Sequence, residues 1–397
     1  KGPALFLMVG AMVLPNLSQA QERPHALDEL IALGMENNAG LKAGSLKVDR
    51  ADALVGSAFT FDKAHVYHSY DQNNRDINNE PLRVFGMQQD FLFPTVYFSA
   101  KKLNRAEFNL TSSSYDIQKK ALTREITSGY YQYQYVREKA SVYRLLDSLY
   151  LNFAAMASRR FELGETNYLE KITAGAKQKQ IQIAREQAEQ EVTLALNRLG
   201  SSIQIETDMA IAEVPLEKLE LKEVDIEQME EIDFAENRIS FFEAQNRYAK
   251  QQLLPDLSFN YFQGTNSNLG DQLYGYQLGL KVPLLFSGQA SKVKASKIAL
   301  QTANEESKEY RIQLNSRYTA LMAQLVKFDR ALAYYELEGR VLADQILKTA
   351  TLSFKNGEID FFQYLQSLEN AYEIELNYLE NLNSYNQTVI EINYLTL

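Results

Sequence analysis

The sequence predicts a mainly α-helical chain with a small β part, in which one arrangement of helices and strands occurs twice. Long series of apolar residues at heptad spacing predict long, paired helices, and short runs that alternate apolar with polar or small residues predict strands. The duplication is clearest in "RFELGETNYLEKI" (160–172) and "SFKNGEIDFFQYL" (353–365), which place Phe161 and Phe354 193 positions apart. A period this long is too long for a solenoid repeat and indicates duplication of a whole subdomain.

Composition excludes several classes of function. The 397 residues carry a net charge of −10, which argues against nucleic-acid binding as the main task. The chain has no cysteine, so disulfides, thiol catalysis, cysteine metal sites and a lipid-anchor cysteine are excluded. Its 24 tyrosines and 20 phenylalanines suit a core, an interface or a membrane belt.

The first twenty residues are typical of a signal peptide. Lys1 precedes an apolar run, Ala4 to Leu14, and Ser18-Gln19-Ala20 forms a small-x-small cleavage site. The alternative, a short membrane helix, needs about 20 apolar residues, and no run of that length occurs later in the chain. We therefore expect residues 1–20 to be removed on export.

The mature chain divides into two repeats, 21–200 and 227–397, joined by a connecting segment, 201–226. The connecting segment is charged and poor in glycine, so we expect it to run around the equator of the helical part and not to act as a flexible linker.

Each repeat contributes two predicted strands, at about 63–70 and 84–93 in the first and about 256–263 and 274–283 in the second. The clearest is Tyr274 to Val282, where one face is apolar and the other carries Gly, Gln, Gly and Lys. About ten alternating residues suit a tilted transmembrane strand, although a half-exposed hairpin of a soluble protein gives the same pattern. Four strands cannot close a membrane barrel, but three chains that contribute four each would close one of twelve strands.

The helices are predicted to be long and to pack as coiled coils. One heptad series predicts a helix from about Gly288 to Phe354, about 100 Å long at 1.5 Å per residue. Its members are Leu314, Tyr318, Leu321, Leu325, Phe328, Leu332 and Tyr335, with Gly339 at the next position and Leu342, Ile346 and Thr349 beyond it. The returning helix continues with Leu365, Leu368, Tyr372, Leu376 and Leu379, and 103–159 and 170–199 are the equivalent helices of the first repeat.

Prolines and glycines mark where the elements change. Pro94 and Pro283 end the second strand of each repeat, because proline has no N–H for the ladder, and Ser287-Gly288 begins the second long helix. At the helical turn, Gly357 suits the left-handed conformation that ends a helix, and Asp360 with Gln363 has capping-box spacing. Gly164, Asn167 and Glu170 occupy the equivalent positions of the first repeat.

This duplicated helix–strand–strand–helix layout resembles the TolC-like outer-membrane efflux proteins over about Ala26 to Leu397. The sequences "LKVPLLFSGQASKVKASKIAL" and "FKNGEIDFFQYL" support the resemblance, and "FLFPTVYFSAKK" (91–102) resembles the heavy-metal efflux branch. The resemblance implies a homotrimer with a twelve-stranded barrel in outer-membrane lipid and a twelve-helix periplasmic tube. It also implies a periplasmic adaptor and an inner-membrane pump of the RND type as partners.

The resemblance further implies that the two helical turns form the periplasmic tip, where the adaptor docks and the channel closes. The residues expected there are Phe161, Gly164, Glu165, Asn167, Phe354, Gly357, Glu358 and Asp360.

Catalytic, cofactor and metal sites are not expected. His65 and His68 are three apart, which on a strand points them to opposite faces, and no phosphate-binding, G-x-S-x-G or H-E-x-x-H motif occurs. The leading hypothesis is a passive export channel for metal ions, drugs or other small molecules. The alternatives are a periplasmic coiled-coil structural or adaptor protein without a membrane barrel, and an exported enzyme.

Overall fold

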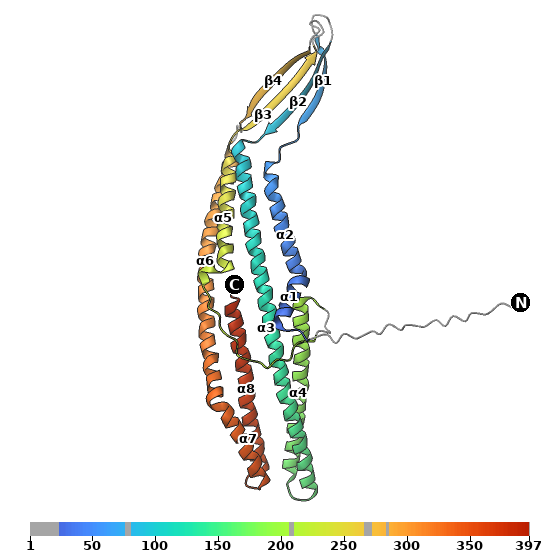
Figure 1. The fold of residues 1–397 in the computed structure, drawn as a ribbon, viewed down its shortest axis with the longest axis vertical. Coiled ribbons are helices and arrows are strands. Elements are labelled where there is room, and N and C mark those ends of the chain that lie inside the picture. Colours follow the sequence, from blue (N-terminus) through green and yellow to red (C-terminus); the bar gives the residue numbers. More distant parts are fainter. Residues whose placement is uncertain (1–23, 76–80, 206–209, 266–271, 283–285, 397) are drawn as a thin grey trace, which may run out of the picture.

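The computed structural model describes residues 24–75, 81–205, 210–265, 272–282 and 286–396. The predicted signal peptide, 1–20, and Pro283 lie outside these residues. The molecule is elongated, with a four-stranded sheet at one end and two helical turns at the other (Figure 1). The prediction of a mainly α-helical chain with a small β part is confirmed.

The two halves have the same order of long elements. The first half contains α1 (Leu27–Asn37), α2 (Ala39–Gly56), β1 (His65–Arg75), β2 (Pro81–Phe91), α3 (Pro94–Glu162) and α4 (Tyr168–Ile203), with a short 3-10 turn, η1 (Ser57–Phe59), after α2. The second half contains the 3-10 turn η2 (Ile226–Gln228), α5 (Glu230–Gln251), β3 (Asp256–Thr265), β4 (Gln272–Lys281), α6 (Ser287–Tyr334), the π-helical turn η3 (Tyr335–Gly339), α7 (Arg340–Lys355) and α8 (Phe361–Asn393).

All four strands extend further toward the hairpin loops than the sequence predicts. Polar side chains there do not prevent backbone pairing, so the ladder continues through Asp71 and through Gln263. The second strand of each pair ends two residues earlier than predicted, at Phe91 and at Lys281. After Phe91 the chain needs two residues to turn before Pro94 begins α3.

The fold is a single layer of four tracks that lie side by side, each made of one strand and the helices that continue it. The strands lie in the order β1-β2-β3-β4, each antiparallel to its neighbours. Each strand is connected to one helix directly below the sheet: β1 to α2, β2 to α3, β3 to α5 and β4 to α6. Below them, α4 lies under α1 and α2, and α8 lies under α5 (Figure 1). Among the described residues, no helix combines the length and the apolar character that a membrane span requires.

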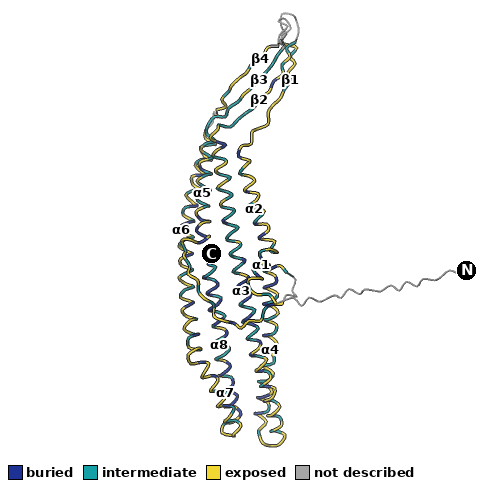
Figure 2. Tube along the Cα trace, viewed as in Figure 1, coloured by how far each residue is buried: buried dark blue, intermediate teal, exposed yellow. Residues whose placement is uncertain are grey.

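The core lies between the helices. Figure 2 shows the buried positions along the helical tracks, whereas Gly86 is the one buried residue among the described strand positions. The heptad series is confirmed as far as the π turn, since Leu314 and Leu332 are fully buried and Leu325 nearly so. In the returning helix α8, Leu365, Leu368, Tyr372 and Leu379 are buried as predicted.

The predicted continuation of the series through Leu342, Ile346 and Thr349 is wrong by one position. Leu342 and Thr349 are exposed, and the core of this segment is formed by residues one further along the chain: Ala343, Leu347, Ala350 and Phe354. The cause is the π-helical turn η3, which adds one residue to the helix and advances every later position by one. Tyr335 at its start stacks on Tyr378 of α8, with ring centroids 3.8 Å apart.

The connecting segment crosses three helices. The Leu216 amide donates to Glu138 of α3 at 2.7 Å, and the Leu219 amide donates to Asn386 of α8 at 2.8 Å. Lys218 lies 2.7 Å from Asp329 of α6, and this hydrogen bond raises the pKa of the Lys218 amine. The two amide bonds satisfy backbone groups that no helix or sheet satisfies, and together with the Lys218 bond they hold the segment against the helices.

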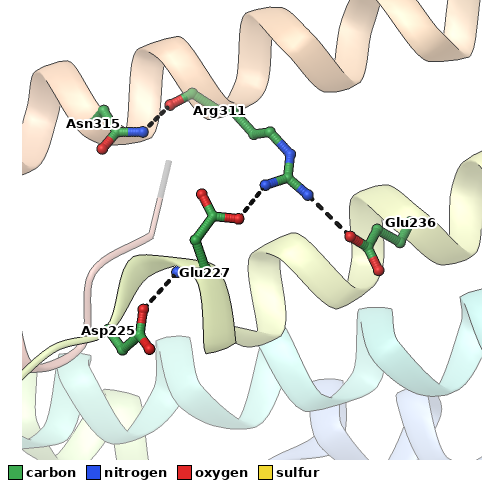
Figure 3. A network of polar contacts seen from close by, with 5 residues as sticks. All are labelled: Asp225, Glu227, Glu236, Arg311 and Asn315. Carbon is green, nitrogen blue, oxygen red and sulfur yellow. Dashed lines mark hydrogen bonds and ion pairs between the residues drawn. The ribbon is translucent and has the colours of Figure 1, made fainter.

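The segment ends at a polar network on α6 (Figure 3). Asp225 accepts a hydrogen bond from the Glu227 amide at 3.1 Å, and Arg311 of α6 binds the carboxylates of both Glu227 and Glu236. One guanidinium therefore ties η2 and α5 to α6.

Candidate functional sites: the two-faced sheet and the helical tips

The sheet has one apolar face. The strand register brings together Val66, His68 and Tyr70 of β1, Phe85, Met87, Gln89 and Phe91 of β2, Leu257, Phe259 and Tyr261 of β3, and Tyr274, Tyr276, Leu278 and Leu280 of β4. On β4 these side chains are largely free of protein contact, since Tyr274 is 75% exposed and Leu278 is 74% exposed. An apolar patch of this extent marks a surface that contacts another apolar phase.

The opposite face of the sheet is polar. The Tyr67 hydroxyl bonds Asn260 at 3.4 Å, and Gln88 donates to Asp90 at 3.2 Å. Lys281 forms an ion pair with the same Asp90 carboxylate. The alternation predicted for Tyr274 to Val282 is therefore present in β4. On the other strands the apolar face also carries polar side chains, namely His68, Arg83, Gln89 and Gln263.

Glycines on the polar face are covered by aromatic rings. A Cβ at Gly86 would lie 2.3 Å from the Tyr67 ring, and one at Gly275 would lie 2.5 Å from the Phe262 ring. Each ring belongs to the residue directly paired with its glycine on the neighbouring strand. The rings fill the space that the missing side chains leave and hold the strands in register.

We expect Gly275→Ala to destabilise the sheet. The added methyl group collides with the Phe262 ring, and such overpacking costs about 1–3 kcal/mol. Gly264→Ala on β3 is the matched control, because its nearest neighbour would lie at 3.5 Å. Denaturant titration should give a lower free energy of unfolding for Gly275→Ala alone; equal values for both variants would show that Phe262 does not fill the space at Gly275.

Both edges of the sheet are unpaired. Among the described residues, β1 pairs with β2 alone and β4 pairs with β3 alone. Edge strands of ten or eleven residues present rows of free N–H and C=O groups that pair readily with another chain.

The strand-to-helix junctions follow the predicted pattern where they are described. Pro94 is the first residue of α3, where its missing N–H is not needed. Helix α6 begins at Ser287, so Gly288 lies in its first turn, and no side chain caps this end.

At the other end of the molecule, both helical turns have the conformation predicted for them. Gly164 and Gly357 have φ values of +74° and +75°, in the left-handed region that favours glycine. The residue after each glycine donates its amide to a carbonyl five positions back, Glu165 to Arg160 and Glu358 to Ser353, both at 2.8 Å. These are the bonds of a Schellman motif, which satisfies the last carbonyls of α3 and α7.

The returning helices are capped as predicted. Asp360 accepts from the Gln363 amide at 2.8 Å while the Gln363 side chain accepts from the Asp360 amide at 3.0 Å. Asn167 accepts from the Glu170 amide at 2.9 Å. The structure adds that the Glu170 carboxylate binds Arg160 at 3.1 Å, a contact that sequence spacing does not reveal.

The predicted tip residues differ in what they contact. Both phenylalanines are half-buried: Phe354 packs against the core and stacks on Tyr364 with ring centroids 4.7 Å apart, whereas Phe161 contacts Tyr168 of its own turn. The Glu358 carboxylate accepts from Ser353 at 2.8 Å and so belongs to its own turn. Two apolar side chains near Glu165 that the sequence pattern does not single out are also exposed at this turn: Leu163, at 64%, and Leu169, at 59%.

The two strand histidines lie on opposite faces of the sheet. His65 lies on the polar face and His68 on the apolar face, as the three-residue spacing predicts. In the part of the chain that the structure describes, no group of three or more His, Cys, Asp or Glu side chains could hold a metal ion.

Comparison with known proteins identifies the fold. No protein-family model and no curated protein matches the sequence. Solved structures do match nearly the whole chain, and three of them, each 15% identical to it, serve as examples. A membrane protein from Pseudomonas aeruginosa has a TM-score of 0.78, with 93% of this chain and 92% of that chain covered.

The other two are described as outer-membrane proteins. The CmeC outer-membrane channel of Campylobacter jejuni has a TM-score of 0.74 and covers 99% of this chain and 93% of its own. The outer-membrane protein VceC of Vibrio cholerae has a TM-score of 0.77, with 93% and 95% covered. The chain therefore has the fold of these outer-membrane proteins, from the sheet to the helical tips.

Proposed function

We propose that the chain is one protomer of a trimeric outer-membrane channel in a tripartite efflux system. The channel passively conducts metal ions, drugs or other small molecules that an inner-membrane pump delivers through a periplasmic adaptor. The observation that carries the proposal is the sheet, which has one exposed apolar face, one polar face and two unpaired edges.

The apolar face favours a membrane barrel over the alternative, a periplasmic coiled coil without one. In water, Tyr274, Tyr276 and Leu278 would each remain mostly exposed, which is unfavourable and promotes aggregation. In lipid the same side chains are solvated by acyl chains, and the polar face lines an aqueous interior.

Closure of the edges supports a trimer. An open sheet edge in lipid leaves backbone groups unsatisfied at several kcal/mol each, so β1 and β4 must pair with neighbouring chains. Three chains of four strands give twelve strands, and the four helical tracks extend beneath them as twelve. Helices at the two sides of the layer also expose large apolar side chains: Leu46 of α2 and Leu194 of α4 on one side, Ile312 of α6 and Val341 of α7 on the other.

The location and partners rest on the resemblance and on the fold shared with CmeC and VceC. The sheet would lie in outer-membrane lipid and the helices in the periplasm, after removal of residues 1–20. An adaptor and an RND-type pump complete the system. The stretch 91–102, which resembles the heavy-metal branch, forms the end of β2 and the start of α3, remote from the tips.

Membrane fractionation tests the proposal. The protein should stay with outer membranes through osmotic shock and high salt and be released by detergent alone. Release by shock or salt would contradict the membrane barrel and favour the periplasmic alternative.

The tip turns are proposed as the adaptor-docking end, because each lies a full long helix away from the sheet (Figure 1). Glu165→Lys is expected to weaken adaptor binding at least about tenfold, since a like charge opposite a matched partner costs several kcal/mol. The same reversal at Glu358 also breaks its bond to Ser353, so Glu165 is the cleaner position.

The control is Glu309→Lys, an exposed reversal in the middle of α6. Binding of purified adaptor and the trimer fraction on a sizing column should be measured together. Normal adaptor binding by Glu165→Lys, or loss of the trimer, would reject the docking assignment. Valine at Gly164 and Gly357, which strains the left-handed turns, should likewise reduce transport while trimers assemble.

A further inference from the structure

A groove of about 400 Å³ lies between α3 and α5, directly below the sheet. Thr95, Phe98 and Lys102 of α3 and Arg247, Lys250 and Gln251 of α5 line it. Because α3 and α5 are the two central tracks of the layer, a neighbouring chain that extends the sheet at β1 or β4 lies beside α2 or α6 and leaves this groove open.

The groove is positively charged. Lys102, Arg247 and Lys250 contribute three cations, and Glu243 is the one carboxylate in its lining, 3.7 Å from Arg247. Lys102 and Lys250 are exposed, and neither forms an ion pair with another described residue. Two cations are therefore available to an anionic ligand.

Aromatic rings connect the groove to the apolar face of the sheet. Phe98 in the groove contacts Phe59 with ring centroids 5.5 Å apart, and Phe59 stacks on Tyr97 at 6.1 Å. Tyr97 contacts Phe61 at 5.4 Å, which contacts Phe91 at 5.6 Å. Phe91 is a member of the apolar face, so a continuous line of ring contacts runs from the groove to that face.

A second hollow, apolar and of about 340 Å³, begins at Phe91. Leu257, Phe259, Leu278 and Leu280 form its apolar lining. A cationic groove, a line of aromatic rings and an apolar hollow thus follow one another from the helices to the strands, in the order of headgroup, interface and acyl chain of a lipid.

We propose that the groove binds the phosphate-bearing headgroup of an anionic phospholipid. Lys102, Arg247 and Lys250 hold the headgroup, and the acyl chains lie along the hollow beside Phe91. This site rests on the proposed membrane location of the sheet. A free phosphate ion would use the cations alone, whereas a lipid also uses the apolar hollow, which is why the lipid is the occupant that fits both features.

Native mass spectrometry of the full chain in detergent tests the site. The probes are dioleoylphosphatidylglycerol, dioleoylphosphatidylcholine and inorganic phosphate, each added at matched concentrations. The test variant combines Lys102→Gln, Arg247→Gln and Lys250→Gln. Its control combines Lys327→Gln, Arg330→Gln and Lys348→Gln, which removes the same charges from exposed positions of α6 and α7.

The wild type and the control should bind phosphatidylglycerol in preference to phosphatidylcholine, and the test variant should bind it at least about tenfold more weakly, since each cation near an anionic headgroup contributes about 1 kcal/mol. Equal binding of phosphatidylglycerol by both triple variants, or no preference over phosphatidylcholine, would overturn the proposal. Binding of inorganic phosphate as tight as that of the lipid would assign the groove to a free anion instead.

Flotation with phosphatidylcholine vesicles separates this proposal from the function on which it rests. The test variant should float with the vesicles like the wild type, because the apolar face is unchanged. A wild type that does not float contradicts the membrane barrel, whereas a test variant that floats and still binds phosphatidylglycerol normally contradicts the lipid site alone.

Discussion

Leu278→Arg is expected to remove the protein from the membrane, whereas Gln277→Arg, one residue earlier on the same strand, is expected to leave it there. Leu278 lies on the apolar face of β4 and is 74% exposed. An arginine facing lipid costs about 2–4 kcal/mol at the bilayer midplane, and the trimer would carry three of them. Gln277 pairs with Asn260 on the polar face, where a charge meets water.

The measurement is the fraction of protein that resists extraction from membranes by salt, followed for both variants and the wild type. Loss of membrane association in Leu278→Arg alone supports the assignment of the two faces. Equal behaviour of the two variants would mean that the faces are not distinguished by lipid and water.

A second large effect is expected from single-residue deletions in α6 and in the π turn. Deleting Leu337 should be tolerated, because it removes the one extra residue of η3 and leaves the later core positions, Ala343 and Ala350, where they are. Deleting Ala323, an exposed residue of α6, should be severely destabilising. It rotates Leu325 and Leu332 out of the core, and the loss of one such buried side chain costs about 2–5 kcal/mol.

Thermal unfolding followed by circular dichroism compares the two deletions at equal chain length. We expect the Leu337 deletion to unfold near the wild-type midpoint and the Ala323 deletion to unfold far below it. The reverse order would show that the π turn is needed for stability and does not merely shift the helical phase.

The turn at Gly357 and the π turn differ in how far the sequence predicts them. The helix end at Gly357 and the cap at Asp360 were predictable because both depend on residues within one turn of each other. The one-residue shift at Tyr335–Gly339 was not predictable, because the heptad spacing in the sequence continues unchanged through Gly339. Packing against α8 decides where the helix accommodates an extra residue.

The same distinction holds for the candidate sites. The two faces of β4 follow from strict alternation and were predictable. The grouping of Lys102 with Arg247 and Lys250 was not, because it depends on α3 and α5 lying side by side although they are far apart in the sequence. Phe161 and Phe354 occupy equivalent positions in the two copies of the turn, and that pattern does not reveal that Phe354 stacks on Tyr364 beside the core.

Crosslinking between neighbouring sheets tests most directly whether three chains close one barrel. Each test variant combines Tyr276→Cys on β4 with one substitution on β1: Val66→Cys, His68→Cys or Tyr70→Cys. Because the sequence contains no other cysteine, every crosslink in such a variant joins the introduced residues. Paired strands lie about 4.8 Å apart, within reach of a short bismaleimide, whereas β1 and β4 of one chain are separated by two strands. In native membranes, closure predicts crosslinked dimers and trimers with nothing larger; monomers throughout the panel, or a ladder that continues beyond three chains, would contradict it.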